Sequence, residues 1–224
     1  MDIAGNIALL RKEIPQHIKI IAVSKTMPVS SIKEAYETGQ RAFGENKVQE
    51  LLNKQPLMPE DTEWHLIGHL QTNKVKFVVP FVNMIHSVDS LKLLSEINRE
   101  AAKIGKTINC LLQIRIATEV TKFGLTWPEA RNIFSSEDFA TLRFIKIVGL
   151  MGMATFTDDE NRLKEEFALL AGYFNEAQKL WFSKDPSFKE ISMGMSGDYK
   201  IAIAAGSTMV RIGSLIFGER LYNR

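Results

Sequence analysis

Residues 145–182 carry the sequence IKIVGLMGMATFTDDENRLKEEFALLAGYFNEAQKLWF, in which an apolar segment is followed by an amphipathic one. Residues 145–154 are rich in apolar and β-branched side chains, which predicts a buried strand. In the second segment, apolar side chains recur at steps of three and four: Leu163, Phe167, Leu170, Phe174, Ala177 and Trp181. Because Asp158 and Asp159 place negative charge where a helix would begin, residues 158–182 are predicted to form one helix.

The same succession of strand and helix recurs along the chain. Apolar segments that predict strands occupy eight stretches: 18–25, 42–46, 63–68, 84–89, 108–116, 145–154, 190–196 and 208–213. A second amphipathic segment, 90–104, ends at Gly105, and Thr126 before Trp127-Pro128 predicts another helix start. Such alternation is typical of a parallel sheet. Eight units in 224 residues fit one compact (β/α)8 barrel domain over residues 1–224, and an open doubly wound sheet is the alternative.

The composition is that of an ordinary globular protein. Apolar residues make up 45% and charged residues 24% of the chain, which argues against a disordered or fibrous protein. The 28 basic and 26 acidic residues leave a net charge of +2, too small an excess to indicate a nucleic-acid partner. The single cysteine, Cys110, indicates a reducing compartment and is expected to be buried. No apolar run reaches the roughly 18 residues of a membrane span, and residues 1–19 lack a signal-peptide core. We therefore expect a cytoplasmic protein without a membrane partner.

A lysine closes the first predicted strand. The sequence Ala22-Val23-Ser24-Lys25-Thr26 puts an amine at the carboxyl end of a strand, where a barrel carries its functional groups. Partial desolvation there favours the neutral amine, which condenses with aldehydes to form a Schiff base. The alternative is a structural lysine whose ammonium group reaches the solvent at the rim.

The last two predicted strands end in serine and glycine. Ser196 follows the seventh strand and is predicted to open a helix, and Gly213 and Ser214 follow the eighth. Glycine turns and helix N-termini expose backbone N–H groups that bind phosphate, and barrels frequently hold phosphate after strands seven and eight. The alternative is that Ser196 is only a helix cap and that the glycines only form turns.

A rim lysine opposite a phosphate site suggests a phosphorylated aldehyde, of which pyridoxal 5′-phosphate (PLP) is the commonest cofactor. Arg211 carries only hydrogen-bond donors, so an arginine facing the pyridine nitrogen would keep that nitrogen unprotonated. A structural ion pair inside the barrel is the alternative for Arg211. The spacing of His65, His69 and His86 matches no compact ligand motif, so no metal is expected. We interpret His65 as a structural histidine of the core.

Six motifs run from the first predicted strand to the last. They are AVSKT (22–26), FGEN (43–46), WHLIGHLQTNK (64–74), GLMGMA (149–154), SMGMSGD (192–198) and AAGSTMVRIG (204–213). Together they resemble the pyridoxal phosphate homeostasis proteins, the YggS/PROSC family. The resemblance implies a single barrel similar to the N-terminal domain of alanine racemase, with no C-terminal β-domain. The fifth strand departs from the family's pattern at residues 113–117, so we expect no polar contact to the cofactor from it.

The resemblance also implies a role for each residue of a cofactor site. Lys25 would hold PLP as a Schiff base, and Arg211 would face the ring nitrogen. Asn46 would lie beside the ring, and Met153 would pack near its face. The phosphate group would be held by three residues of the last two loops: Ser196, Gly213 and Ser214.

The family's activity is implied in the same way: it buffers or delivers PLP, a form of vitamin B6, without robust catalysis. A racemase needs a second base from a separate domain, and the chain ends at Arg224, soon after the eighth strand. We therefore expect a monomeric PLP-binding protein with no catalytic residues, and apo PLP-dependent enzymes as transient partners. A racemase-like PLP enzyme acting on an unidentified amino acid and a PLP-independent barrel enzyme acting on a phosphorylated sugar are the alternatives. Lys47, Lys74 and Lys122 are the other candidate amines.

Overall fold

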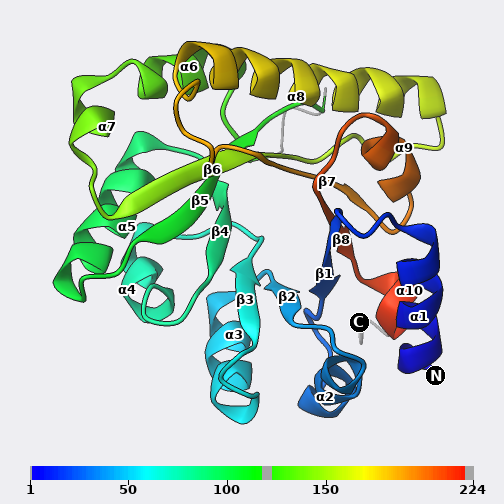
Figure 1. Ribbon diagram of the computed structural model, residues 1–224. Helices are drawn as coiled ribbons and strands as arrows, with labels where there is room; N and C mark the ends of the chain where they lie inside the picture. The colour runs from blue at the N-terminus through cyan, green and yellow to red at the C-terminus, as the bar shows by residue number, and fades with distance from the viewer. Residues whose placement is uncertain (1, 118–122, 220–224) are drawn as a thin grey trace.

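The computed structural model of the protein describes residues 2–117 and 123–219. Eight parallel strands form a closed barrel in chain order (Figure 1). The strands are β1 (Lys19–Val23), β2 (Ala42–Glu45), β3 (Glu63–Leu66), β4 (Met84–Val88), β5 (Ile108–Ile114), β6 (Ile145–Gly152), β7 (Glu190–Met195) and β8 (Met209–Ile212). The pairing of β1 with β8, which sets Lys19 beside Met209, closes the barrel and rules out an open sheet. The predicted (β/α)8 architecture is therefore confirmed.

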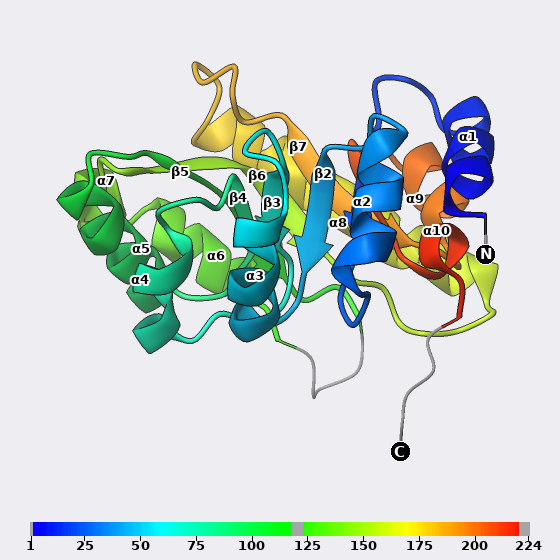
Figure 2. The ribbon, with the colours of Figure 1, turned by 90° about the horizontal axis from the view of Figure 1, so that it is seen from below.

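Helices cover the outside of this barrel, as Figures 1 and 2 show. They are α1 (Ile3–Glu13), α2 (Val29–Glu37), α3 (Val48–Lys54), α4 (Val75–Val78), α5 (Leu91–Lys103), α6 (Trp127–Phe134), α7 (Glu137–Thr141), α8 (Glu160–Leu180), α9 (Tyr199–Ala204) and α10 (Ser214–Phe217), with short 3-10 turns η1 (Gln55–Leu57) and η2 (Thr72–Lys74). Helix α1 packs beside α10, where Asn6 Nδ2 donates to the carbonyl of Ile216 (3.0 Å), so the first and last helices meet. None of the helices in the described ranges is both long and apolar enough to cross a bilayer.

The predicted elements match the observed ones closely. All eight strands are present, each within two residues of its predicted ends. Helices α8 and α5 correspond to the predicted helices 158–182 and 90–104. The prediction that Ser196 opens a helix was wrong: α9 begins at Tyr199, and Asp198 is its N-cap residue. Asp198 Oδ1 instead accepts a hydrogen bond from the Met195 N–H (2.5 Å), which holds residues 196–198 in a turn.

Two apolar layers lie on the two sides of the barrel wall. Alternate strand residues point outward and pack against the helices, among them Phe43, Trp64 and Ile85. Their neighbours point inward and form a smaller cluster: Ile21, Ala42, Met84, Leu111, Val148, Met151 and Met209. Cys110 is fully buried, as expected. This alternation also decides which residues at the strand ends reach the interior of the barrel.

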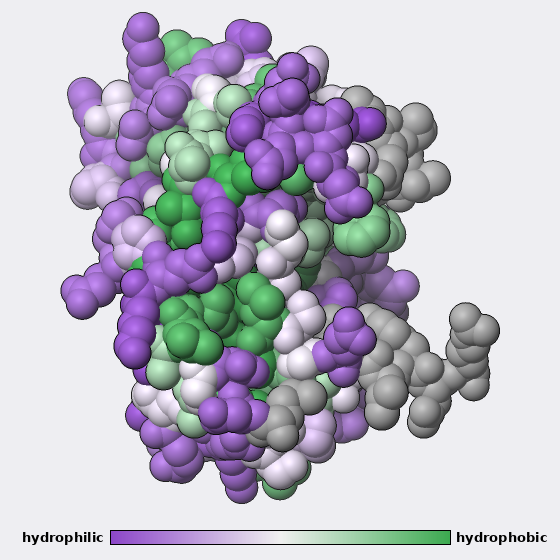
Figure 3. All heavy atoms as spheres, turned by 90° about the vertical axis from the view of Figure 1, so that its right-hand side faces the viewer, coloured by the Kyte–Doolittle hydropathy of each residue, from purple (hydrophilic) through white to green (hydrophobic). Residues whose placement is uncertain are grey.

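The side of the barrel that carries α1, α9 and α10 exposes apolar surface. Figure 3 faces this side and shows hydrophobic surface between hydrophilic side chains. Leu9 of α1 is 65% exposed and Leu215 of α10 is 42% exposed, whereas Ile201 and Ile203 of α9 are half-buried. These short helices therefore cover the seam between β8 and β1 without burying all of their own apolar side chains.

The start of α6 has the predicted cap. Thr126 Oγ1 accepts a hydrogen bond from the Glu129 N–H (3.4 Å), and a Glu129 carboxylate oxygen accepts one from the Thr126 N–H (2.7 Å). We expect Thr126→Ala to lower the free energy of unfolding by about 1 kcal/mol, because the exchange leaves a helix N–H without its acceptor. Urea denaturation measures this change. Thr107→Ala, at an exposed threonine before β5, should stay within about 0.5 kcal/mol of the parent protein, and equal losses in the two variants would contradict the capping role.

Candidate functional site

A cavity of about 550 Å³ opens at the carboxyl ends of the strands. It is lined by residues at or after the ends of β1, β2, β3, β6, β7 and β8. All seven residues predicted for a cofactor site line it: Lys25, Asn46, Met153, Ser196, Arg211, Gly213 and Ser214. The structure thus brings together side chains that are up to 189 positions apart in the sequence. Whether each of them touches a cofactor stays a prediction.

Lys25 stands just beyond β1, between two residues that are held by carboxylates. Strand alternation turns Val23 and Lys25 toward the cavity and Ser24 toward the helices. Ser24 Oγ donates to Glu45 Oε1 (2.6 Å), and the Thr26 N–H donates to Glu50 Oε2 (2.7 Å). Thr26 has a φ of 65°, a left-handed conformation that is unfavourable for a β-branched residue. The bond to Glu50 stabilises this turn and so fixes where the Lys25 side chain starts.

A buried ion pair lies behind Lys25, between the barrel wall and α3. Lys54 Nζ donates to Glu45 Oε1 (2.8 Å), to the Ser24 carbonyl (2.9 Å) and to Glu50 Oε2 (3.2 Å). The Glu45 side chain is fully buried and that of Lys54 is 9% exposed. Burial raises the pKa of Glu45, and the ammonium group of Lys54 and the hydroxyl of Ser24 act against that rise. We name Ser24, Glu45, Glu50 and Lys54 the Lys25 brace.

Two loops meet on the side of the cavity formed by β7 and β8. The Gly213 N–H donates to Ser196 Oγ (3.2 Å), which ties the turn after β7 to the start of α10. Gly194 has a φ of 91°, and a Cβ there would lie 2.6 Å from the Ala202 Cβ, so only glycine allows α9 to pack this closely. The Ser196 hydroxyl hydrogen, the Ser214 hydroxyl and the first N–H groups of α10 are the donors that these loops can offer to an anion.

Arg211 is buried in the floor of the cavity and bonded to neutral acceptors. Nη1 donates to the carbonyl and to the Oγ of Ser192 (2.8 and 2.7 Å), and Nη2 donates to the Gly152 carbonyl (3.0 Å). These three bonds use three of the five guanidinium N–H groups, so two remain to donate to a ligand. Burial lowers the pKa of Arg211 to about 10, and it still carries its charge at neutral pH. No carboxylate of residues 2–117 and 123–219 forms an ion pair with it, so the alternative of a structural ion pair was wrong for this part of the chain.

Asn46 and Met153 complete the predicted set. Asn46 follows β2, and a Cβ at Gly68 would lie only 2.3 Å from its carbonyl oxygen. Glycine at position 68 therefore lets the loop after β3 support Asn46 closely. Met153 follows β6 and lines the cavity together with Val23 and Ile67, which supply apolar surface.

The sequence analysis missed the loop after β6. Residues 155–158 line the cavity, and Phe156 is 96% exposed. Glu166 of α8 holds this loop, since its carboxylate accepts from the Thr155 N–H (2.6 Å) and from the Thr155 hydroxyl (2.7 Å). The position of these residues directly after a predicted barrel strand was the available signal, because barrel sites form there.

Two of the other candidate amines and the described tyrosines lie away from the cavity. Lys47 and Lys74 are exposed and do not line the cavity, and Lys122 falls outside the described residues. No described tyrosine lines the cavity: Tyr36 is in α2, Tyr173 is in α8, and the Tyr199 hydroxyl donates to Glu13 (2.7 Å). Tyr222 also falls outside the described residues. No group of three or more His, Cys, Asp or Glu side chains within the described ranges is arranged to hold a metal ion.

Comparison with known proteins identifies relatives over nearly the full chain. The model of the alanine racemase N-terminal domain family matches residues 2–221. The pyridoxal phosphate homeostasis protein of Aquifex aeolicus is 37% identical over 205 residues, which cover 91% of this chain and 88% of the relative. The protein of the same name from Escherichia coli K12 is 37% identical over 237 residues and covers 100% of this chain and 99% of the relative.

Solved structures show the same relationship. PipY of Synechococcus elongatus, solved without PLP, superposes with a TM-score of 0.90 at 36% identity and covers 96% of this chain and 100% of that chain. The structure of PipY with PLP bound gives a TM-score of 0.87 at 35% identity, with the same coverage. An alanine racemase of Clostridium difficile shares the fold (TM-score 0.80) at 14% identity, and this chain matches 58% of it. The chain belongs to the alanine racemase N-terminal domain family and, within it, to the pyridoxal phosphate homeostasis proteins.

Proposed function

We propose that the protein binds PLP in the cavity at the carboxyl ends of its strands and buffers or delivers this cofactor. The observation that carries the proposal is the donor set of one cavity: the Lys25 amine, the Arg211 guanidinium, which forms no ion pair within residues 2–117 and 123–219, and the hydroxyl and N–H groups of the last two loops. A volume of about 550 Å³ suits a ligand of this size. The PLP-bound structure of the related PipY supports the same assignment.

Each residue would have a distinct task in holding the cofactor. The Lys25 amine would attack the aldehyde carbon, so that a C=N bond forms and the aldehyde oxygen leaves as water. The Ser196 and Ser214 hydroxyls and the first N–H groups of α10 would bind the phosphate group, and the Gly213 N–H would hold the Ser196 hydroxyl in place for it. Asn46 and Met153 would contact the ring.

Arg211 would decide how reactive the bound cofactor is. PLP supplies an electron sink in enzymes, and this property depends on the protonation of its ring nitrogen. A guanidinium has only donors, so its remaining N–H groups would bond to an unprotonated nitrogen and leave the ring a poor electron sink. This arrangement favours storage of PLP over catalysis with it.

A carrier needs no second base, whereas a racemase needs two on opposite faces of its substrate. The alternative of a PLP-dependent enzyme would have to recruit a carboxylate, and Asp158, Asp198 and Glu219 line the cavity. Asp198 accepts the Met195 N–H on one oxygen only, and burial raises its pKa, so all three carboxylates are candidates for such a base. The names of the curated relatives favour the carrier.

The test is to load the purified protein with PLP, record its absorbance, and measure its intact mass before and after borohydride reduction. We expect a yellow protein that gains one reduced PLP adduct per chain and passes PLP to an apoenzyme. With common amino acids as substrates, turnover should stay at the level of free PLP. A colourless protein that takes up no PLP would overturn the binding proposal, and substantial racemase or transaminase turnover would favour the enzyme instead.

A further inference from the structure

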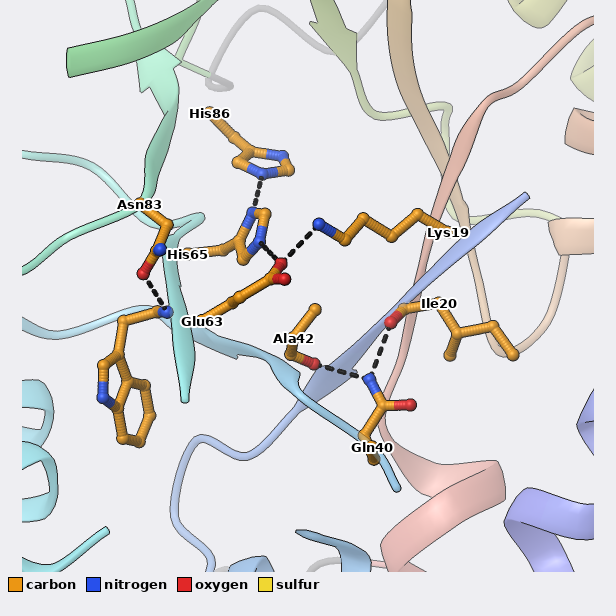
Figure 4. A network of polar contacts seen from close by, with 9 residues as sticks. Lys19, Ile20, Gln40, Ala42, Glu63, His65, Asn83 and His86 are labelled. Atoms are coloured by element: carbon orange, nitrogen blue, oxygen red, sulfur yellow. Dashed lines mark hydrogen bonds and ion pairs between the residues drawn. The ribbon is translucent and has the colours of Figure 1, made fainter. Parts of the chain in front are cut away.

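A column of polar side chains runs through the barrel from one end to the other. Figure 4 shows its lower part, in which His86, His65, Glu63 and Lys19 follow one another. Above them, Arg211 contacts Ser192, and Ser192 Oγ contacts His86 Nδ1 (2.9 Å). The six residues of this barrel column come from five strands: Arg211, Ser192, His86, His65, Glu63 and Lys19.

The barrel column passes through the interior, not along the wall. His86 on β4 meets Ser192 on β7, and Lys19 on β1 pairs with Glu63 on β3, although neither pair of strands is adjacent in the sheet. Its upper end, Arg211, lines the proposed PLP cavity. Its lower end, Lys19 and Glu63, lines a second cavity of about 370 Å³ among residues at the amino ends of β1, β2 and β3. The column therefore connects two openings of the molecule.

A polar column is unusual in this place. Barrel interiors are filled mostly by branched apolar side chains, and buried polar groups are costly unless they are hydrogen-bonded. Ser192, His65 and His86 are at most 1% exposed, and Arg211 is 4% exposed. Arg211 forms no ion pair within residues 2–117 and 123–219, although the Asp198 carboxylate adds negative charge near it, and its hydrogen bonds go to neutral groups. The barrel column supplies one of these neutral groups, the Ser192 hydroxyl, and connects it to His86.

The chemistry of the two ends favours one direction for the hydrogen bonds between Arg211 and His65. Arg211 can only donate, so Nη1 donates to Ser192 Oγ (2.7 Å), and the Ser192 hydroxyl keeps its own hydrogen to donate to His86 Nδ1, although its second lone pair would also allow the reverse order. His86 then carries its proton on Nε2 and donates to His65 Nδ1 (2.8 Å). The lower end decides between the two orders, because a proton on His65 Nε2 would face the Glu63 carboxylate; Nε2 lies 3.8 Å from Glu63 Oε2, beyond hydrogen-bond distance, and has no hydrogen-bond partner among the described residues. The opposite order would aim a nitrogen lone pair at the Glu63 carboxylate.

The charges around the two imidazoles agree with this direction. Burial lowers the pKa of both His65 and His86, so both rings are neutral at neutral pH. The imidazole of His65 and the ammonium group of Lys19 lower the pKa of Glu63 to about 2, so its carboxylate is the fixed acceptor at the lower end. Glu190 of β7 adds negative charge near His65, and Arg211 adds positive charge near His86. Lys19 adds positive charge near both rings, so the direction rests on the Glu63 carboxylate that faces His65 Nε2.

We propose that Ser192, His86, His65 and Glu63 are positioning residues for Arg211: the first three form a one-directional chain of hydrogen bonds that ends facing the Glu63 carboxylate, with both imidazoles in the Nε2–H form. The chain takes the place of a carboxylate partner: it orients the guanidinium and leaves its other N–H groups for the ring nitrogen of PLP. This last point rests on the proposed function, whereas the direction of the chain does not. The side chains of Lys19 and Glu63 are 41% and 38% exposed. A change of charge at this exposed end should therefore alter the tautomers of His65 and His86 inside the barrel.

Imidazole NMR tests the chain without any cofactor. Two-bond 1H–15N correlation spectra of the labelled protein distinguish Nδ1–H, Nε2–H and charged rings. We expect His65 and His86 to stay neutral and Nε2-protonated between about pH 6 and 8. An Nδ1–H form of either buried ring, or ordinary titration of either, would overturn the proposal.

Two variants test the ends of the chain. Glu63→Gln removes the negative charge that faces His65 Nε2, so we expect His65 to populate both neutral tautomers, whereas Glu60→Gln at a neighbouring exposed site should leave its spectrum unchanged. Ser192→Ala removes an acceptor of a buried charge, so we expect PLP to bind roughly tenfold more weakly and its absorbance to depend differently on pH. Unchanged spectra in Glu63→Gln, or parent-like affinity and pH profile in Ser192→Ala, would contradict the role. Failure of the parent protein to bind PLP would defeat the proposed function but not the tautomer result.

Discussion

The Lys25→Ala variant should lose the borohydride-fixable PLP adduct completely and keep only weaker, noncovalent binding. Lys25 is the only lysine among the described residues that line the cavity, so no other amine of that part of the chain reaches the aldehyde. The donors of the phosphate loops and Arg211 remain in place, because Lys25 makes none of their hydrogen bonds. Intact mass after reduction measures the adduct, and a fluorescence or absorbance titration measures the residual affinity.

Three further lysine variants serve as controls for this result. Lys47→Ala and Lys74→Ala change exposed lysines beyond the ends of β2 and β3 and should keep the full adduct. Lys122→Ala tests the remaining candidate from the sequence analysis. If Lys25→Ala keeps the parent level of reducible adduct and one of the other three loses it, Lys25 is not the anchor. If Lys25→Ala loses all affinity for PLP, the phosphate loops contribute less than proposed.

The fold was predictable because its strands are buried on both faces. Such strands carry continuous apolar runs, so the stretch 145–154 and its counterparts stand out in the sequence. Most of the predicted strand ends lay one or two residues beyond the observed ends. The prediction counted residues that directly follow a strand as part of it: Ser24 and Lys25 follow the last residue of β1, and Asn46 follows the last residue of β2. Barrels carry their sites in the loops after the strands, and this general rule predicted that the candidate residues lie close together.

The contacts that support the site were not predictable in the same way. The Lys25 brace joins Ser24, which follows β1, Glu45 of β2, and Glu50 and Lys54 of α3, and no spacing in the sequence indicates that they meet. His65 was interpreted as a structural histidine, which fits its burial, but its pairing with His86 and the link from His86 to Ser192 depend on the closure of the barrel. The wrong helix start at Ser196 has a similar cause, because serine and aspartate both cap helices and the sequence does not decide between Ser196 and Asp198.

The Lys54→Met variant should lower the free energy of unfolding by about 3–5 kcal/mol at neutral pH, since it leaves Glu45 as a buried carboxylate without its cation. Lys47→Met, at an exposed lysine at the start of the same helix, is the matched control and should change stability by no more than about 0.5 kcal/mol. Adding Glu45→Gln to Lys54→Met should recover part of the loss, because the double variant buries no charge at these two positions. Urea denaturation of the four proteins measures all three effects.

The loss in the free energy of unfolding caused by Lys54→Met should depend on pH in a predictable direction. Burial raises the pKa of Glu45, and Lys54 opposes that rise, so the variant should raise the pKa of Glu45 further. A carboxyl group with a raised pKa in the folded state adds stability below its unfolded pKa of about 4.3, and this stability is lost as the pH rises through the folded pKa. The difference between parent and variant should therefore be smaller at about pH 5 than at about pH 8. An equal difference at both pH values would mean that the loss comes from packing of the lysine side chain, and the ion pair would then not be what holds the segment around Lys25.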